Sequence, residues 1–188
     1  MRVRYVLTAL VVAVVTGVLC VGGLSRLAMS LLASRNPQAH GRLSDDGFEM
    51  GVVTFGGSAN LAVLGVLVGV VGWLTYLVAR PLLVGPTWFQ WFCLSVPPGV
   101  VAASMVVHPE GVDFTVLQPL WLTVGLFVAV PAVYGPLVHA VMLRTGATPI
   151  GVALAGRAPV AAWVVRGFFA ALAVAALVSL VGDVRALV

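Results

Sequence analysis

Five apolar runs, each long enough to cross a lipid bilayer, constrain this chain of 188 residues more than any other feature. A transmembrane helix needs about 20 apolar residues, because the hydrocarbon core is about 30 Å thick and each helical residue adds about 1.5 Å. The sequence predicts membrane spans over about residues 5–32, 49–79, 88–107, 117–143 and 160–181. We therefore expect an all-α integral membrane protein, in which residues 1–188 form a single bundle of five transmembrane helices.

The composition excludes a water-soluble domain. Hydrophobic residues make up 61% of the chain and charged residues only 9%, and the mean hydropathy is +1.13. A soluble domain with an ordinary polar surface does not reach these values. Because the five runs use most of the residues, the loops are too short to form a further domain outside the bilayer.

Two signals mark the ends of the second span. Asp46 and Glu49 have the spacing of a capping box with aspartate in place of serine or threonine, which sets the beginning of this helix near Gly47. Arg80-Pro81 ends it, because proline disfavours a helical conformation at the residue before it. Prolines inside the third and fourth spans predict kinked or broken helices there. They are Pro97, Pro98, Pro131 and Pro136.

Small residues recur every three or four positions on three of the spans. This spacing lets helix backbones approach closely in lipid, where hydrophobicity gives no drive for helix association. The predicted helix-packing residues are Gly65, Gly69 and Gly72 on the second span and Gly167, Ala171 and Ala175 on the fifth. We expect these two spans to dock against each other. The first span has a similar face, made by Ala9, Ala13 and Gly17.

The charged residues predict the orientation in the membrane. The ten basic residues are all arginines, a usage typical of GC-rich bacterial coding sequences, and they are scattered singly, which argues against a nucleic-acid partner. With the N-terminus in the cytoplasm, the inner side carries Arg2, Arg4, Arg80, Arg144, Arg157 and Arg166, and the outer side carries Arg26, Arg35, Arg42 and Arg185. All six acidic residues then lie outside. This agrees with the positive-inside rule and predicts a multi-pass protein of the cytoplasmic membrane.

Arg26 is predicted to reach the outer boundary of the first span. Asp46 and Glu49 begin the next predicted helix, so an ion pair between Arg26 and either carboxylate would fasten the first two spans together. A site for an anionic ligand at Arg26 is the alternative reading.

Arg166 lies about two turns inside the fifth span, on the side to which no acidic residue is assigned. A charge within a span is costly unless its side chain reaches the headgroup region. The alternative to such a snorkelling side chain is a shared contact with an anionic lipid headgroup. The residues predicted for that contact are Arg80, Arg144, Arg166 and His139.

The chain lacks the side-chain patterns of familiar membrane enzymes. It has no paired carboxylates within the spans, no serine or cysteine with a base at usable spacing, no phosphate loop and no CxxC. The three histidines match no metal or haem ligand pattern, so we predict neither a metal nor a cofactor. Proton-coupled transport and intramembrane hydrolysis are disfavoured.

The first half of the chain resembles a group of small bacterial polytopic membrane proteins whose role is uncharacterised. The residues that carry the resemblance are Arg26-Leu-Ala-Met29, Gly57-Ser58, Gly65, Gly69, Gly72, Tyr76 and Arg80-Pro81. The resemblance covers about residues 20–83. It implies a location in the membrane and transfers no activity.

Three functions remain open from the sequence. The leading hypothesis is a non-enzymatic structural or accessory subunit that packs with itself, as a homo-oligomer, or with a larger membrane protein complex. The second is a carrier or binding protein for a lipid or other apolar small molecule, with the proline-containing third and fourth spans lining its cavity. The third is an enzyme acting on lipid-linked substrates.

Overall fold

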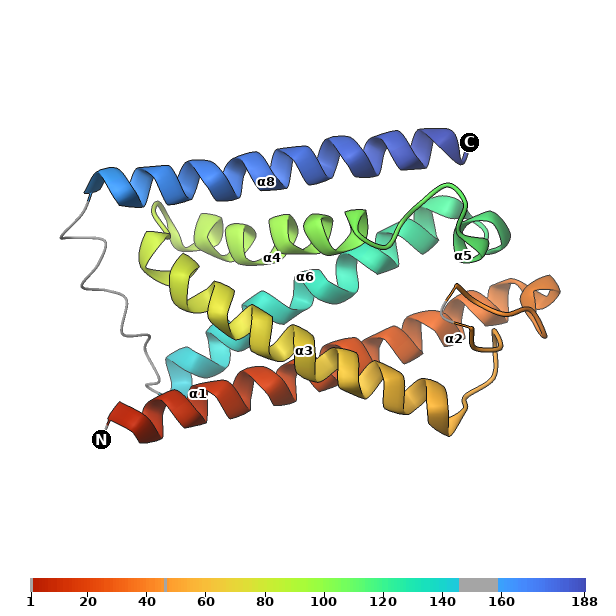
Figure 1. Cartoon of the computed structure of the whole chain (residues 1–188), viewed down its shortest axis with the longest axis horizontal. Helices are drawn as coiled ribbons and strands as arrows, with labels where there is room; N and C mark the ends of the chain where they lie inside the picture. The colour runs from red at the N-terminus through yellow and green to blue at the C-terminus, as the bar shows by residue number, and fades with distance from the viewer. Residues whose placement is uncertain (1, 46, 146–158) are drawn as a thin grey trace.

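The computed structural model describes residues 2–45, 47–145 and 159–188 (Figure 1). Within these ranges every regular element is a helix, and the single β-bridge joins Leu43 to Glu49. The elements are α1 (Arg2–Gly17), the π-helical turn η1 (Val18–Leu24), α2 (Ser25–Arg35), the 3-10 turn η2 (Pro37–Ala39), α3 (Phe55–Ala79), the 3-10 turn η3 (Arg80–Leu82), α4 (Thr87–Ser104), α5 (Val112–Val116), α6 (Leu120–Thr145) and α8 (Pro159–Ala186).

Four helical segments are long and apolar enough to cross a membrane, as expected for a membrane protein. They are Val6–Arg35, Phe55–Leu82, Leu120–Arg144 and Val160–Ala186. The first of these joins α1, η1 and α2 into one continuous rod. The third predicted span, residues 88–107, corresponds to α4, which has 18 residues and is not among the four.

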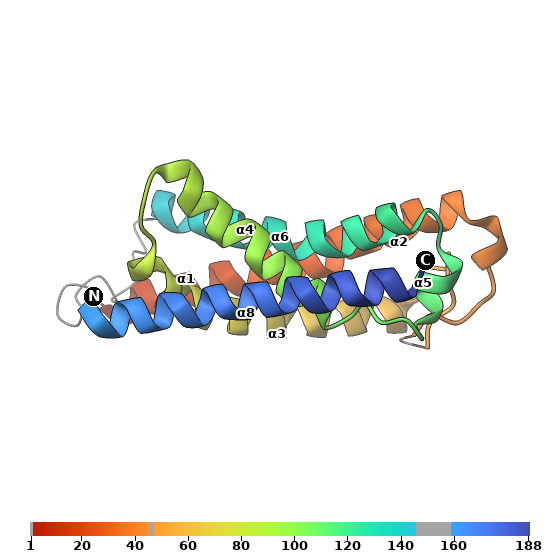
Figure 2. The ribbon, with the colours of Figure 1, turned by 90° about the horizontal axis from the view of Figure 1, so that it is seen from above.

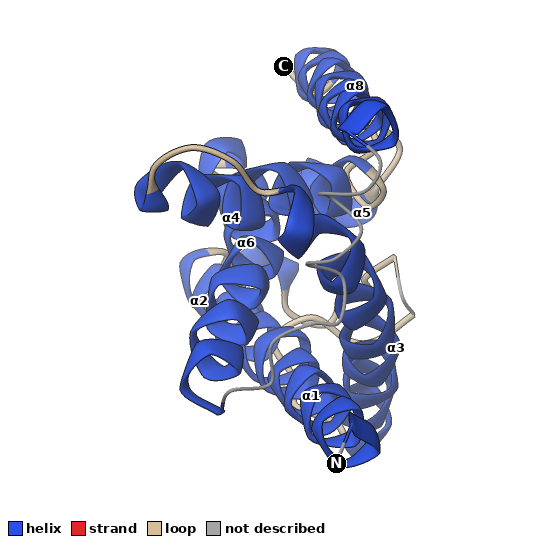
Figure 3. Ribbon diagram, turned by 90° about the vertical axis from the view of Figure 1, so that its left-hand side faces the viewer, coloured by secondary structure: helices blue, strands red, loops and turns tan. Residues whose placement is uncertain are grey.

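The long helices run back and forth along the same axis, and the two chain termini lie at opposite ends of the bundle (Figure 1). Seen from one end, α1 and α3 form a pair at one side, α4 and α6 lie in the middle, and α8 lies apart at the other side (Figure 3). Figure 2 shows α8 running along most of the length of the molecule. The helices that contact each other most are α4 with α6, α1 with α3, and α8 with α4.

Most apolar side chains of the spans point outward. At most 28% of any of the four spanning segments is buried within the chain, and large residues such as Leu67, Val71 and Val178 are more than half exposed. The largest internal cluster joins α1, η1, α3, α4 and α6 through Ala9, Ala13, Cys20, Tyr76, Leu94, Tyr134, Val138 and Met142. A rod that is apolar all round needs lipid as its solvent.

The beginning of α3 differs from the prediction. The helix starts at Phe55, and its N-cap is Thr54, whose hydroxyl oxygen accepts a hydrogen bond from the Gly57 amide at 3.1 Å. The capping box at Asp46 and Glu49 was the wrong signal, because residues 47–54 belong to a looped connection. Gly47 has a φ of +76° there, which ends any helical run.

A buried asparagine joins the end of α2 to the chain just before α6. The Asn36 side chain donates to the Gln118 carbonyl oxygen and accepts from the Gln118 amide, both at 2.9 Å, and it also donates to the Leu32 carbonyl oxygen at 2.8 Å. Only 1% of Asn36 is exposed. One side chain therefore supplies hydrogen-bond partners for backbone groups at the end of α2 and just before α6.

The prolines do not break their helices. Pro97 and Pro98 lie inside α4, and Pro131 and Pro136 lie inside α6, and both helices continue through them. Close contact between α4 and α6 accompanies them. A Cβ on Gly99 would lie 2.6 Å from the Val128 carbonyl oxygen, and a Cβ on Gly135 would collide with the Leu94 carbonyl group.

Candidate functional site

Gly65 and Gly69 lie where α3 crosses the first rod. A Cβ built on Gly65 would lie 2.7 Å from the Cα atom of Val18, and one on Gly69 would lie 2.6 Å from the Cα atom of Val14. Gly17 faces them from the other side, since its Cβ would lie 2.8 Å from the Cα atom of Gly69. Only glycine allows the two backbones to come this close.

Gly72 has a different neighbour. A Cβ at this position would collide with the Tyr134 ring, which reaches across from α6. The Tyr134 hydroxyl donates to the Gly69 carbonyl oxygen at 3.0 Å. Gly65 and Gly69 of α3 therefore contact the first rod, and Gly72 contacts the Tyr134 ring.

The predicted docking of the fifth span against the second is wrong. The partner of α3 is the first rod, whereas α8 packs on α4 and touches η3. The small-residue faces of the first and second spans match each other directly, with Ala13, Gly17 and Gly69 all buried. The side of α3 that carries Gly65 and Gly69 is therefore occupied by the first rod, not by α8.

The small-residue ladder of α8 faces away from the bundle. Gly167, Ala171 and Ala175 are all exposed, and nothing lies within 4 Å of a Cβ built on Gly167. The buried side of α8 is made by Ala162, Ala176 and Leu180. At about 100° per residue the ladder lies roughly 150° around the helix from this buried side. Only 11% of the spanning part of α8 is buried within the chain.

A polar cluster is buried between α3, α4 and α6 near the N-terminal end of the bundle. The Tyr76 hydroxyl and the His139 Nδ1 atom lie 2.8 Å apart and form a hydrogen bond. The Trp91 ring meets the His139 ring edge-on, with centroids 5.5 Å apart. Arg80 lies one turn beyond Tyr76 on the same side of the chain, close to the Tyr76 and His139 side chains.

The sequence singled out Tyr76 in the resemblance and His139 as a possible lipid contact, but it did not show that the two residues are partners. His139 lies 63 positions further along the chain, and no spacing rule connects the two residues. The available signal was that both are polar residues inside apolar spans, where such groups almost always find a partner.

Arg166 is held by protein groups. Its Nε atom donates to the Leu82 carbonyl oxygen at 2.8 Å, and its guanidinium lies over the Trp163 ring at 4.7 Å from the centroid. Arg80 is the first residue of the η3 turn, and Arg166 binds the same turn from α8. Arg144 lies exposed near the end of α6. The structure brings Arg80 and His139 together and leaves Arg144 apart, and the anionic-lipid contact of these residues stays a prediction.

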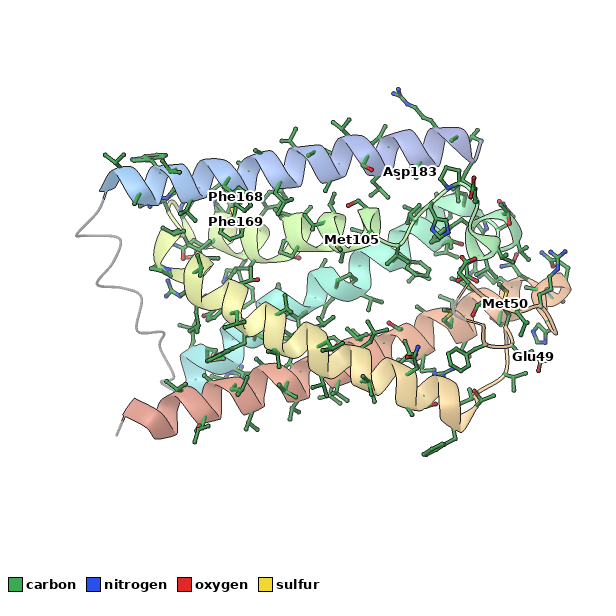
Figure 4. The ribbon with its side chains drawn as sticks, in the orientation of Figure 1. Glu49, Met50, Met105, Phe168, Phe169 and Asp183 are labelled. Carbon is green, nitrogen blue, oxygen red and sulfur yellow. The ribbon has the colours of Figure 1, made fainter. Side chains whose placement is uncertain are left out.

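The predicted ion pair of Arg26 is not formed with Glu49, which is exposed on the connection that follows α2 (Figure 4). Among the described residues no carboxylate pairs with Arg26, and its buried Nε atom has no hydrogen-bond partner. Asp45 instead accepts hydrogen bonds from the amides of Val112 and Asp113 at 2.9 and 3.4 Å. Asp46 lies outside the described residues.

The described residues contain no group of three or more histidine, cysteine or acidic side chains that could hold a metal ion. What they do offer is close backbone contact, one buried tyrosine–histidine pair and several arginines near the bundle ends. No family model, no curated protein and no solved structure matches the chain. The fold and the site define the class of the protein as a small helical membrane protein, and they do not assign it to a family.

Proposed function

We propose that this chain is a five-span protein of the cytoplasmic membrane with its N-terminus in the cytoplasm, in which α4 crosses the membrane in addition to the four longer helical segments. In support, α4 runs along the bundle beside α6, and the termini lie at opposite ends (Figure 1). Glu49 and Asp183 lie at the end opposite the N-terminus (Figure 4), and so does α5, which carries Asp113 (Figure 1). Arg80, Arg144 and Arg166 lie toward the N-terminal end, as the positive-inside rule would require. Arg157 lies outside the described residues.

The role we propose is that of a non-enzymatic accessory subunit that assembles within the bilayer, with a second copy or with a larger membrane complex. The observation that carries this proposal is the outward-facing ladder of small residues on α8, which no helix of the described part of the chain covers. It consists of Gly167, Ala171, Ala175 and Ser179. The equivalent small residues on α3, Gly65 and Gly69, are covered by the first rod. An uncovered ladder suits a close helix contact with a partner.

A pair of adjacent alanines on α8 tests this role. Ala171→Leu fills the ladder, whereas Ala170→Leu makes the same change at an exposed position about 100° around the helix. After mild extraction from the membrane, native mass spectrometry should show an assembly for the wild type and for Ala170→Leu, and its loss for Ala171→Leu. An unaccompanied wild-type monomer, or equal behaviour of the two variants, would contradict the proposal.

The geometry gives less support to a carrier whose cavity lies between the proline-containing helices. Gly99 and Gly135 bring α4 and α6 into backbone contact at two levels. These contacts close the space that the prolines were expected to open.

A further inference from the structure

Two arginines meet at the η3 turn, at the end of the bundle where the N-terminus lies (Figure 1). Arg80 is the first residue of the turn. Arg166 reaches it from α8 and donates from its Nε atom to the carbonyl oxygen of Leu82, the last residue of the turn, at 2.8 Å. Both arginine side chains are partly exposed. Two positive charges are therefore anchored at one turn of three residues.

The chain has no acidic side chain near this turn. None of its six acidic residues falls within residues 50–109 or within residues 114–182, a range that includes the undescribed residues 146–158. Glu49, Asp183 and the C-terminus lie at the opposite end of the bundle (Figures 1 and 4), and Asp113 lies there in α5. The carbonyl groups at the end of a helix supply only about half a negative charge. The turn therefore keeps a net positive charge.

The Arg166 guanidinium has donors left for a further acceptor. Its Nε atom is bound to Leu82, and its carbon atom lies 4.7 Å from the centre of the Trp163 ring. Within the described part of the chain its two Nη groups have no hydrogen-bond partner. Side chains of a helix point back toward the beginning of that helix. The free Nη groups are therefore directed toward the end of the bundle, where the bilayer surface would lie.

The neighbours of Arg166 on α8 suit the boundary between headgroups and acyl chains. Trp163 lies one turn nearer the end of the bundle and is 66% exposed, as is typical of tryptophan at headgroup level. Phe169 lies one turn deeper on the same side of α8 (Figure 4). Only 11% of the spanning part of α8 is buried within the chain. Lipid headgroups are thus the nearest source of negative charge for Arg166.

We propose that η3 and the beginning of α8 bind the headgroup of one anionic phospholipid. The Nη groups of Arg166 hold its phosphate, Arg80 adds attraction from the same turn, and Phe169 contacts the first acyl carbons. A guanidinium can donate two parallel hydrogen bonds to one phosphate. Arg144 is not part of this site, because it lies apart at the end of α6. Arg166 projects from the side of α8 that faces the bundle, so the site is separate from the outward ladder.

The test uses the purified full chain in mild detergent and two phospholipids with identical acyl chains, anionic phosphatidylglycerol and zwitterionic phosphatidylcholine. Native mass spectrometry should show one phosphatidylglycerol bound per chain, at least about tenfold more tightly than phosphatidylcholine. A wild type that does not distinguish the two lipids overturns the proposal. If Arg166→Gln instead releases a co-purified protein while lipid binding stays unchanged, Arg166 contacts a protein partner and the lipid site is contradicted. A monomer that binds phosphatidylglycerol as expected would contradict only the assembly proposed for α8.

Matched variants locate the site. Arg166→Gln should weaken phosphatidylglycerol binding about tenfold, whereas Arg144→Gln removes an exposed arginine at the same end of the bundle and should leave it unchanged. Equal binding by these two variants would contradict the assignment.

A second pair of variants keeps both arginines. Trp163→Leu removes the ring that orients the guanidinium and should weaken phosphatidylglycerol binding about threefold. Trp88→Leu is the control, because Trp88 is similarly exposed, at 70%, at the beginning of α4, and the described cation–π contact of Arg166 is with Trp163. If Arg166→Gln fails to fold, this pair and the lipid comparison on the wild type decide the question, and equal binding by the two tryptophan variants would overturn the site.

Discussion

Gly69 of α3 meets Val14 of α1 so closely that a Cβ on the glycine would lie 2.6 Å from the Cα atom of the valine. Such a distance leaves no room for any side chain between the two backbones. The contact repeats one turn earlier on α3, where Gly65 meets Val18. In lipid, where neighbouring acyl chains are as apolar as leucine, this close backbone approach is the main source of attraction between the helices.

Adding one methyl group at this crossing should therefore destabilise the protein. We expect Gly69→Ala to lower the free energy of unfolding by about 1–3 kcal/mol, the usual cost of overpacking. Thermal unfolding in detergent measures the change. Gly125→Ala is the matched control, because nothing lies within 4 Å of its Cβ on α6. The account would be wrong if both variants had the same unfolding temperature.

The hydrogen bond between Tyr76 and His139 should contribute measurably to the packing of α3 on α6. Because hydrogen bonds between transmembrane helices average about 0.6 kcal/mol and reach about 1.7, we expect a coupling of about 1 kcal/mol from a double-mutant cycle of Tyr76→Phe and His139→Phe. The free energy of unfolding of the four proteins gives this value. Thr75→Val alters an exposed neighbour and should leave stability unchanged. Strictly additive effects of the two substitutions would show that the bond contributes nothing.

Asn36 should be the most sensitive polar residue of the connection between α2 and α3. Asn36→Ala removes the hydrogen bonds to Leu32 and Gln118 and should cost about 1–3 kcal/mol of stability, because it leaves backbone groups without partners. Chemical denaturation in mixed micelles can measure the loss. Gln38→Ala removes one longer bond, at 3.1 Å to Asn36, and should have a much smaller effect. Equal losses for the two variants would count against the role of Asn36.

Arg166 should hold the beginning of α8 against η3. Replacing it with leucine removes the bond to the Leu82 carbonyl oxygen and the contact with Trp163. We expect faster hydrogen–deuterium exchange over residues 80–86 and in the first turns of α8. Arg185→Leu removes an exposed arginine at the far end of the same helix and serves as the control. Unchanged exchange in Arg166→Leu would show that other contacts dock α8.

The sequence predicted the helical rods well, because a span needs only length and apolarity, and both are local properties. It also identified small-residue faces at Gly65, Gly69 and Gly17. It could not choose which ladders meet, since every such ladder has the same four-residue spacing, and the docking of the fifth span on the second was wrong. Which faces meet depends on how the whole rods pass one another.

The predicted beginning of the second span was wrong for a different reason. Asp46 and Glu49 imitate a capping box, but Gly47 adopts a positive φ and the chain turns before Thr54 caps the helix. Contacts between distant positions, such as Tyr76 with His139 and Asn36 with Gln118, leave no trace in local spacing. The lack of a hydrogen-bond partner at the Arg26 Nε atom was likewise not foreseen, because the nearby acidic residues suggested an ion pair.

The number of membrane crossings tests the central claim most directly. Green fluorescent protein and alkaline phosphatase, fused in turn to each terminus of the full chain in a bacterial host, report whether that terminus is inside or outside. Five crossings, with α4 among them, require fluorescence only at the N-terminus and phosphatase activity only at the C-terminus. If both termini report from the same side of the membrane, the chain crosses an even number of times and the five-span account is contradicted.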